Sequence, residues 1–180
     1  MITLRQLAQE DAIGFRRVRL LGLQESPTAF GASHAQEAKM GADDFARRLE
    51  GAPDRWVIGA FEDSELVGVI GFARDGGDKS RHKGFIWGMY VIPASRGKGV
   101  GRALLEEALR RIDALPGLRS VRLAVVTSNE VARRLYEKLH FVRFGEEPEA
   151  LCVDGAFHAE YHMVRKSQTA SPPRPPHTQS

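Results

Sequence analysis

The sequence has little of what marks secreted, membrane or nucleic-acid-binding proteins. It contains one cysteine, Cys152, which excludes an intramolecular disulfide and indicates a reducing compartment. No apolar run reaches the ~18 residues of a membrane-spanning helix, and the first residues lack the pattern of a secretory signal. The 26 basic and 23 acidic residues nearly balance, without a long basic run. We therefore expect a soluble, cytoplasmic protein that binds neither membranes nor nucleic acid.

Patterns typical of metal sites and of covalent catalysis are also missing. The six histidines show no metal-ligand spacing such as His-Glu-x-x-His, so no metal is expected. Nothing in the sequence places a base beside Cys152, which makes this thiol a poor candidate nucleophile.

The chain does contain alternating strand and helix patterns within the length of one domain. Strands are predicted at residues 2–7, 56–61, 66–73, 85–92, 121–126, 141–144 and 157–164. Helices are predicted at residues 12–23 and 33–50, and the second is interrupted near Gly41. Two further helices are predicted, one after the turn at residues 96–101 and one after the turn at residues 127–130. Asp11 is expected to cap the first helix, and the spacing from Thr127 to Glu130 predicts a capping box for the last. These elements indicate an α/β (α+β) domain over residues 1–166.

The remaining segment, residues 167–180, has a different composition. It contains four prolines and no large apolar side chain. Such a segment cannot bury enough surface to offset the entropy of ordering, so a disordered proline-rich tail is expected. Docking on a partner is one interpretation, and a terminus without a function is the more common case.

The most informative segment is a glycine-rich turn at residues 96–101, which read Arg-Gly-Lys-Gly-Val-Gly. It follows an apolar strand pattern and leads directly into an amphipathic helix. Glycines let the backbone approach a ligand closely, and the free N–H groups at a helix start attract anions. Arg96, Lys98 and Arg102 add positive charge. The segment therefore predicts a phosphate-binding turn.

Two familiar nucleotide-binding turns do not fit this segment. A P-loop places Lys and then Ser or Thr directly after its last glycine. Here Lys98 lies inside the turn, and the last glycine, Gly101, is followed by Arg102. A dinucleotide fingerprint needs Gly or Ala at its sixth position. Counting from Gly97 that position is Arg102, and counting from Gly99 it is Leu104. The spacing therefore excludes both motifs.

The turn resembles the pyrophosphate-binding turn Arg-x-x-Gly-x-Gly of the GCN5-related N-acetyltransferase (GNAT) superfamily. The strand before it ends Met-Tyr-Val-Ile-Pro at residues 89–93, as family members commonly do. Residues 129–141 resemble the second family signature, Asn-x-x-Ala-x-x-Leu-Tyr-x-x-x-Gly-Phe. One position departs from it, because His140 stands where the family usually has Gly. Since Gly there eases a helix into a left-handed end, we expect an altered cap and an intact fold.

This resemblance covers about residues 2–166 and implies a single-domain GNAT fold. That fold is a mixed central sheet of about seven strands, flanked by helices, with a parallel central strand pair. The implied donor is acetyl-CoA, with its pyrophosphate at the glycine turn and its pantetheine arm beside the preceding strand. The implied acetyl-CoA-binding residues are Met89, Tyr90, Val91, Arg96, Gly97, Lys98, Gly99, Val100, Gly101, Arg102, Asn129, Ala132 and Lys138.

The resemblance further implies transfer of the acetyl group to a primary amine by direct attack. Tyr136 falls at the family's general-acid position, where a phenol can protonate the departing thiolate. The alternative interpretation is that Tyr136 only packs on an amphipathic helix. A second hypothesis for the whole protein is a non-catalytic acyl-CoA sensor or interaction module of the same fold.

The acceptor is a small-molecule or peptide amine that the sequence does not identify. Phe30 and Trp87 are candidate walls of its pocket, with core packing as the alternative for both. Glu25, Glu160 and His158 are candidate bases only because they lie in regions that flank the acceptor cleft in relatives, and a solvated residue without a role is the more common interpretation for each. The acidic hairpin at residues 146–160 weakly favours a cationic acceptor. Relatives are often dimers, so a homodimer is one state to test.

Overall fold

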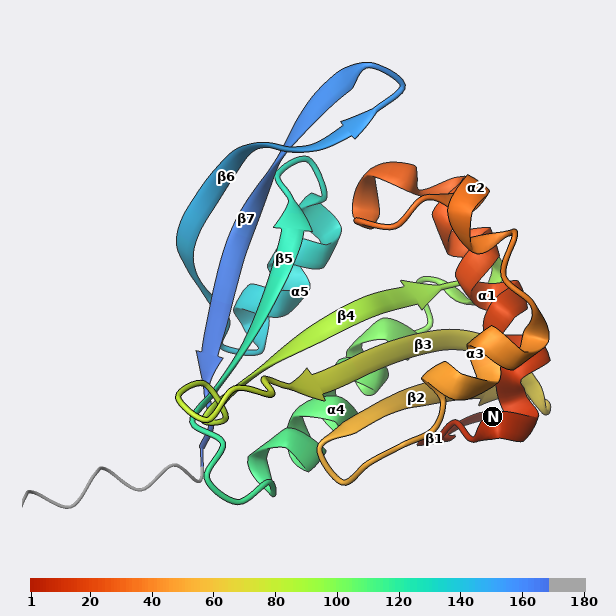
Figure 1. The fold of residues 1–180 in the computed structure, drawn as a ribbon, viewed down its shortest axis with the longest axis horizontal. Coiled ribbons are helices and arrows are strands. Elements are labelled where there is room, and N and C mark those ends of the chain that lie inside the picture. Colours follow the sequence, from red (N-terminus) through yellow and green to blue (C-terminus); the bar gives the residue numbers. More distant parts are fainter. Residues whose placement is uncertain (169–180) are drawn as a thin grey trace, which may run out of the picture.

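The computed structural model describes residues 1–168 of the 180. One mixed sheet of seven strands forms the centre, in the order β1-β2-β3-β4-β5-β7-β6 (Figure 1). The strands are β1 (Ile2–Gln6), β2 (Arg55–Glu62), β3 (Glu65–Arg74), β4 (Lys83–Val91), β5 (Ser120–Val126), β6 (Val142–Val153) and β7 (Ala156–Lys166). The α-helices are α1 (Ala12–Glu25), α2 (His34–Glu37), α3 (Ala42–Arg48), α4 (Val100–Asp113) and α5 (Glu130–Lys138). The expected mixed sheet with a parallel central pair is confirmed.

The parallel pair, β4 and β5, is where the sheet separates. All other neighbouring strands are antiparallel. β4 and β5 pair only at their N-terminal ends, and their last pair is Phe85 with Arg122. Beyond that pair the two strands diverge (Figure 1). The C-terminal half of β4 and the end of β5 therefore lack each other as hydrogen-bonding partners, which creates room between them in the middle of the sheet.

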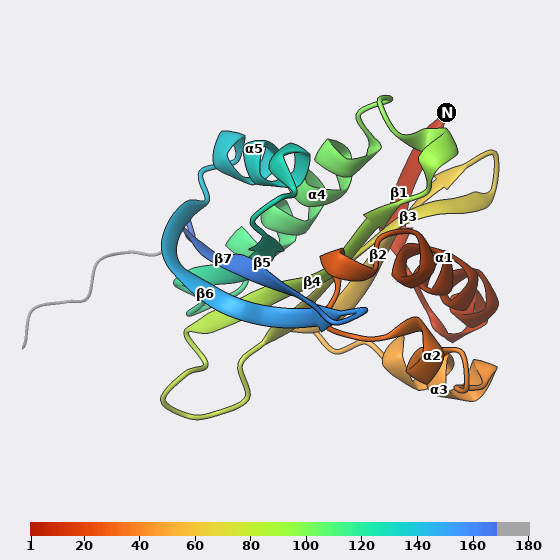
Figure 2. The ribbon, with the colours of Figure 1, turned by 90° about the horizontal axis from the view of Figure 1, so that it is seen from above.

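Helices cover both faces of the sheet (Figure 2). Because successive strand residues point to opposite faces, Ile58 packs with Leu104 and Leu105 beneath α4, whereas Val57 packs with Phe15 and Phe45 beneath α1 and α3. Both clusters are almost fully buried. They hold α4 and α1 on opposite sides of the strands that lead to the divergence.

Several boundaries differ from the sequence prediction for local reasons. The expected helix over 33–50 is two short helices, interrupted before Gly41 as expected. The last two strands are longer than predicted. The backbone groups of β6 and β7 form hydrogen bonds with each other even where the side chains are polar and show no strand pattern. The capping box from Thr127 to Glu130 is wrong, because Asn129 is the N-cap of α5 and accepts from Ala132 N.

Two further local expectations have definite outcomes. Asp11 stands at the N-cap position of α1, but its carboxylate accepts from Arg5 and Ala8 N instead of capping that helix. His140 has φ +69°, so it adopts the left-handed conformation expected where the family has Gly. The fold around it is intact, with Phe141 buried directly after it.

The described chain ends on the body of the domain. Ser167 is buried and its hydroxyl donates to Asp113, which also accepts from Gln168 N and from Arg165. The rest of the expected tail, residues 169–180, lies outside the described residues. In residues 1–168, no helix combines the length and the apolar character that crossing a membrane requires.

Candidate active site

The glycine turn has the geometry of an anion cradle. Gly97 and Gly99 have φ values of +76° and +81°, a conformation that disfavours any residue with a Cβ. Gly99 is the N-cap of α4, so the turn delivers the chain from the end of β4 into the helix. The first N–H groups of α4 have no partner within the helix. With the positive end of the helix dipole, they provide the donors that a phosphate group needs.

The cationic side chains of the turn are paired with carboxylates. Arg96 donates to both oxygens of Glu25, at 2.9 and 2.6 Å, and Lys98 donates to Glu62 at 2.9 Å. Arg102 pairs with Glu106 on its own helix at 2.7 Å. The Arg96 guanidinium holds the pKa of Glu25 at about 2. These three cations are therefore already paired with carboxylates, whereas the first N–H groups of α4 have no partner within the helix.

A large cleft runs from the turn into the gap between β4 and β5. Its volume is about 810 Å³, which is within the range of small-molecule and cofactor sites. It is bounded by the glycine turn, the ends of β4 and β5, the start of α5 and the 3-10 segment η2 (Pro27–Ala29). The residues expected to bind acetyl-CoA that line it are Met89, Tyr90, Val91, Arg96, Gly97, Gly99, Val100, Gly101, Arg102, Asn129 and Ala132.

Two lysines expected in this group lie elsewhere. Lys98 belongs to the turn but its ammonium is directed to Glu62 and is not part of the cleft wall. Lys138 is exposed at the end of α5 and does not line the cleft of the described domain. The local motif locates both lysines in sequence, whereas the direction of each side chain depends on the surrounding fold.

Tyr136 lies on the wall of the cleft. Its side chain is buried, packs edge-to-face on Phe141 at 5.9 Å, and its hydroxyl is 3.7 Å from the Met89 sulfur. A thioether is a weak acceptor. Burial raises the pKa of the Tyr136 phenol to about 12, so the hydroxyl is a proton donor at every physiological pH. The residue is therefore both packed and directed at the gap between the strands.

The three candidate bases have different surroundings. The pKa of Glu25 is too low for a base near neutral pH, because Arg96 binds its carboxylate. Glu160 is half-buried opposite Val126, a residue of the cleft wall, and burial raises the pKa of its carboxyl group. His158 pairs with Leu151 farther along the β6–β7 hairpin. Of the three, Glu160 has the surroundings that best suit a base.

The two candidate acceptor-pocket walls lie in different cavities. Phe30 lines the large cleft, edge-on to Tyr90 at 6.2 Å. Trp87 instead lies over Gly71 and lines a smaller cavity of about 340 Å³ beneath α1 and α3. That cavity holds an ion-pair network of Arg19, Glu37 and Arg48 that sequence reasoning missed. No local signal could have found it, since its members lie on three separate helices.

Within residues 1–168, no three His, Cys, Asp or Glu side chains gather in an arrangement that could hold a metal ion.

Comparison with known proteins agrees with the resemblance to acetyltransferases that the sequence indicates. Residues 16–141 match the model of the Acetyltransferase (GNAT) family. The chain is 36% identical over 126 residues to N-alpha-acetyltransferase RimI of Mycobacterium tuberculosis, covering 68% of this chain and 73% of RimI. It is 43% identical over 70 residues to mycothiol acetyltransferase of Streptosporangium roseum, covering 39% of this chain.

Some curated relatives are much longer than the matched region, which spans 20% of the mycothiol acetyltransferase and 29% of the Mycobacterium leprae protein ML0378. Among solved structures, YncA of Salmonella typhimurium with its cofactor acetyl-CoA superposes with a TM-score of 0.82. The superposition covers 96% of this chain and 98% of YncA at 18% identity, and it shows the shared fold. From the matched family model, the two sequence signatures and this fold, the chain belongs to the GNAT family of acetyltransferases.

Proposed function

We propose that residues 1–166 form an acetyl-CoA-dependent N-acetyltransferase that transfers the acetyl group to a primary amine. One observation carries the proposal. The glycine turn, the diverging ends of β4 and β5, and the Tyr136 hydroxyl all border one cleft. A ligand with a pyrophosphate at one end and a thioester at the other would match this arrangement of anion donors, open strand edges and a proton donor.

In this proposal the pyrophosphate of acetyl-CoA binds the N–H groups of residues 97–102. The pantetheine amides take the place of the missing strand pairing beyond Phe85. Asn129 caps α5 and so orients the helix that carries Tyr136. Bringing the amine and the thioester together in one geometry supplies much of the rate, since proximity can contribute ~7 kcal/mol or more.

The chemical step balances without a metal or a covalent enzyme intermediate. The neutral amine nitrogen attacks the thioester carbonyl carbon, so a C–N bond forms and the C–S bond breaks. The thiolate that leaves is protonated by Tyr136, and the amine gives up a proton to solvent or to a base such as Glu160. The phenoxide recovers its proton from solvent.

The test is an acetylation assay that follows thiol release from acetyl-CoA over a panel of amines. The panel contains amino acids, polyamines, aminoglycosides, lysine peptides and peptides with a free N-terminus, the last because RimI is named an N-alpha-acetyltransferase. We expect thiol release with at least one class. Tight acetyl-CoA binding by calorimetry with no release across the panel would overturn the enzyme proposal and favour the acyl-CoA sensor.

A further inference from the structure

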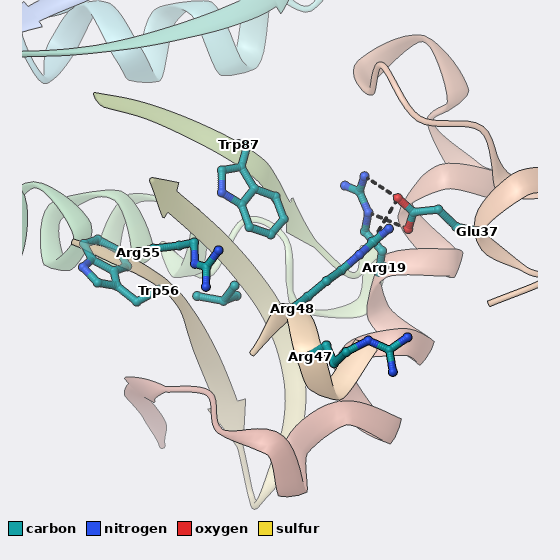
Figure 3. Close-up of a pocket in the computed structure, with 8 residues that line it drawn as sticks. Arg19, Glu37, Arg47, Arg48, Arg55, Trp56 and Trp87 are labelled. Atoms are coloured by element: carbon teal, nitrogen blue, oxygen red, sulfur yellow. Dashed lines mark hydrogen bonds and ion pairs between the residues drawn. The ribbon is translucent and has the colours of Figure 1, made fainter. Parts of the chain in front are cut away.

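The smaller cavity beneath α1 and α3 is unusually rich in arginine. It measures about 340 Å³, and among the described residues its lining includes Arg19, Arg47, Arg48 and Arg55 but only one acidic residue, Glu37 (Figure 3). Trp87 forms an aromatic wall on the β4 side. The volume suits a small molecule or one group of a larger one.

The single carboxylate of the cavity is shared between two arginines. Arg19 donates to both oxygens of Glu37 at 3.1 Å, and Arg48 reaches the same carboxylate at 3.1 Å. The side chains of Arg19 and Glu37 are only 10% and 6% exposed. One negative charge therefore faces two positive charges in a largely buried place. Because buried charge is costly unless it is paired, this cluster favours one further anion.

Arg55 adds to the positive excess at the mouth of the cavity. In the described chain it forms no ion pair, and its hydrogen-bond acceptor is the backbone carbonyl of Glu50 at 3.4 Å. Arg47, by contrast, is paired with Asp44. An anion that entered beside Trp87 would thus meet the guanidinium of Arg55, which has no carboxylate partner among the described residues. It would also meet that of Arg48, which shares the Glu37 carboxylate with Arg19.

The arginine cavity adjoins the acetyl-CoA cleft. Trp87 lines the cavity and Met89 lines the cleft, and in the sequence of β4 only Gly88 separates these two residues. Gly88 has φ +63°, and a Cβ there would lie 3.3 Å from Nη1 of Arg19. The Arg19 guanidinium also lies 5.0 Å from the ring centre of Phe30, another residue of the cleft wall. Arg19 therefore lines the cavity and contacts a residue of the cleft wall, beside the irregular part of β4.

We propose that this arginine cavity binds the anionic group of the acceptor, so that the substrate is a small amine that carries its own carboxylate or phosphonate group. The inference rests on the proposed function. The anion binds between Arg48 and Arg55, the carbon skeleton packs on Trp87, and the amine reaches past Gly88 to the thioester. The anionic group takes no part in bond making, and the transfer step is the one given above.

The acidic hairpin does not oppose this assignment. Glu146 pairs with Arg143, so part of the hairpin's negative charge is already neutralised, and Glu147 forms a hydrogen bond with His162 at 2.9 Å. The expectation of a cationic acceptor came from counting these residues in sequence. The arginine cavity shifts the preference toward an anionic amine and away from polyamines.

Matched acceptors test the proposal by kinetics. Free amino acids and their carboxamides are compared at saturating acetyl-CoA, with L-phenylalanine and L-phenylalaninamide as the first pair. We expect kcat/KM at least ~10-fold higher for the acids. Arg48→Gln and Arg55→Gln should each lower the acid-to-amide ratio toward one. Arg110→Gln, on the exposed side of α4, is the control and should keep it. Equal rates with acids and amides in the wild type would overturn the proposal while leaving the acetyltransferase function standing.

A binding measurement separates this site from turnover. The chain has two tryptophans, and Trp56→Phe leaves Trp87 as the only one. Phenylacetate should then change the Trp87 fluorescence saturably, phenylacetamide should not, and Arg55→Gln should weaken the phenylacetate response ~10-fold. A response to phenylacetate with no acetylation of any amine would refute the enzyme function and retain the anion site. No response to phenylacetate, or an equal response to both probes, would refute the anion site.

Discussion

Replacing Tyr136 with Phe should separate catalysis from stability. The Tyr136 hydroxyl is buried against the cleft, where its partner among the described residues is the Met89 sulfur at 3.7 Å. The substitution removes one oxygen and leaves the ring in its edge-to-face contact with Phe141. The packing that holds α5 is therefore retained, while the proton donor at the cleft is lost.

We expect the substitution to lower kcat strongly and to leave the free energy of unfolding unchanged or slightly higher. A general acid contributes ~10²- to 10⁴-fold, so kcat should fall at least ~100-fold. A buried hydroxyl with only a weak acceptor adds little net stability, and removing it should change the free energy of unfolding by between zero and about 1 kcal/mol in the stabilising direction. For a domain of this size, 1 kcal/mol corresponds to about 2–4 °C in Tm.

The assay is thiol release at saturating acetyl-CoA and acceptor, with thermal unfolding of the same samples. Tyr161→Phe is the matched control, because Tyr161 packs on the core beside β5 and does not line the cleft of the described domain. Since the pKa of Tyr136 is about 12, its deprotonation should produce no loss of wild-type rate below about pH 11. A kcat within threefold of wild type would refute the acid role. A Tm lowered by more than ~4 °C would show that the hydroxyl is structural.

Three further substitutions test the local physics. The pKa of Glu25 is lowered to about 2 by Arg96, so this ion pair stabilises the fold above pH ~4.5 and is lost as the pH falls toward 2. Because the pair is partly exposed, Glu25→Gln should cost at most ~1 kcal/mol in urea unfolding at pH 7, and the difference should vanish near pH 2. His140→Gly should stabilise by about 0.5–1 kcal/mol in the same assay, since φ is +69° there, and a loss would contradict this. Gly71→Ala places a Cβ 2.3 Å from Trp87, so it should cost about 1–3 kcal/mol and alter the near-ultraviolet dichroism; an unchanged spectrum would contradict that contact.

The glycine turn and the helix that carries Tyr136 could be predicted from sequence because their determinants are local. The turn at residues 96–101 needs only a strand before it, left-handed glycines within it and a helix after it, all within a few residues of each other. Asn129 caps the short helix that carries Tyr136, so their spacing already places them on one element. What the pattern could not determine is which carboxylates pair with the turn, since Glu25 is 71 positions from Arg96 and Glu62 is 36 positions from Lys98.

The arginine cavity depended on the fold. Arg19, Glu37 and Trp87 come from two helices and a strand, and no spacing rule connects them. Trp87 was expected beside Phe30, but the alternation of β4 directs it over Gly71 and into the arginine cavity. By itself, the sequence determined the family, the mixed sheet and the glycine turn, because short-range backbone preferences and hydrophobic periodicity depend on neighbouring residues. Only the tertiary structure decided which charges meet and where the cavities lie, because strand order and helix packing set those distances.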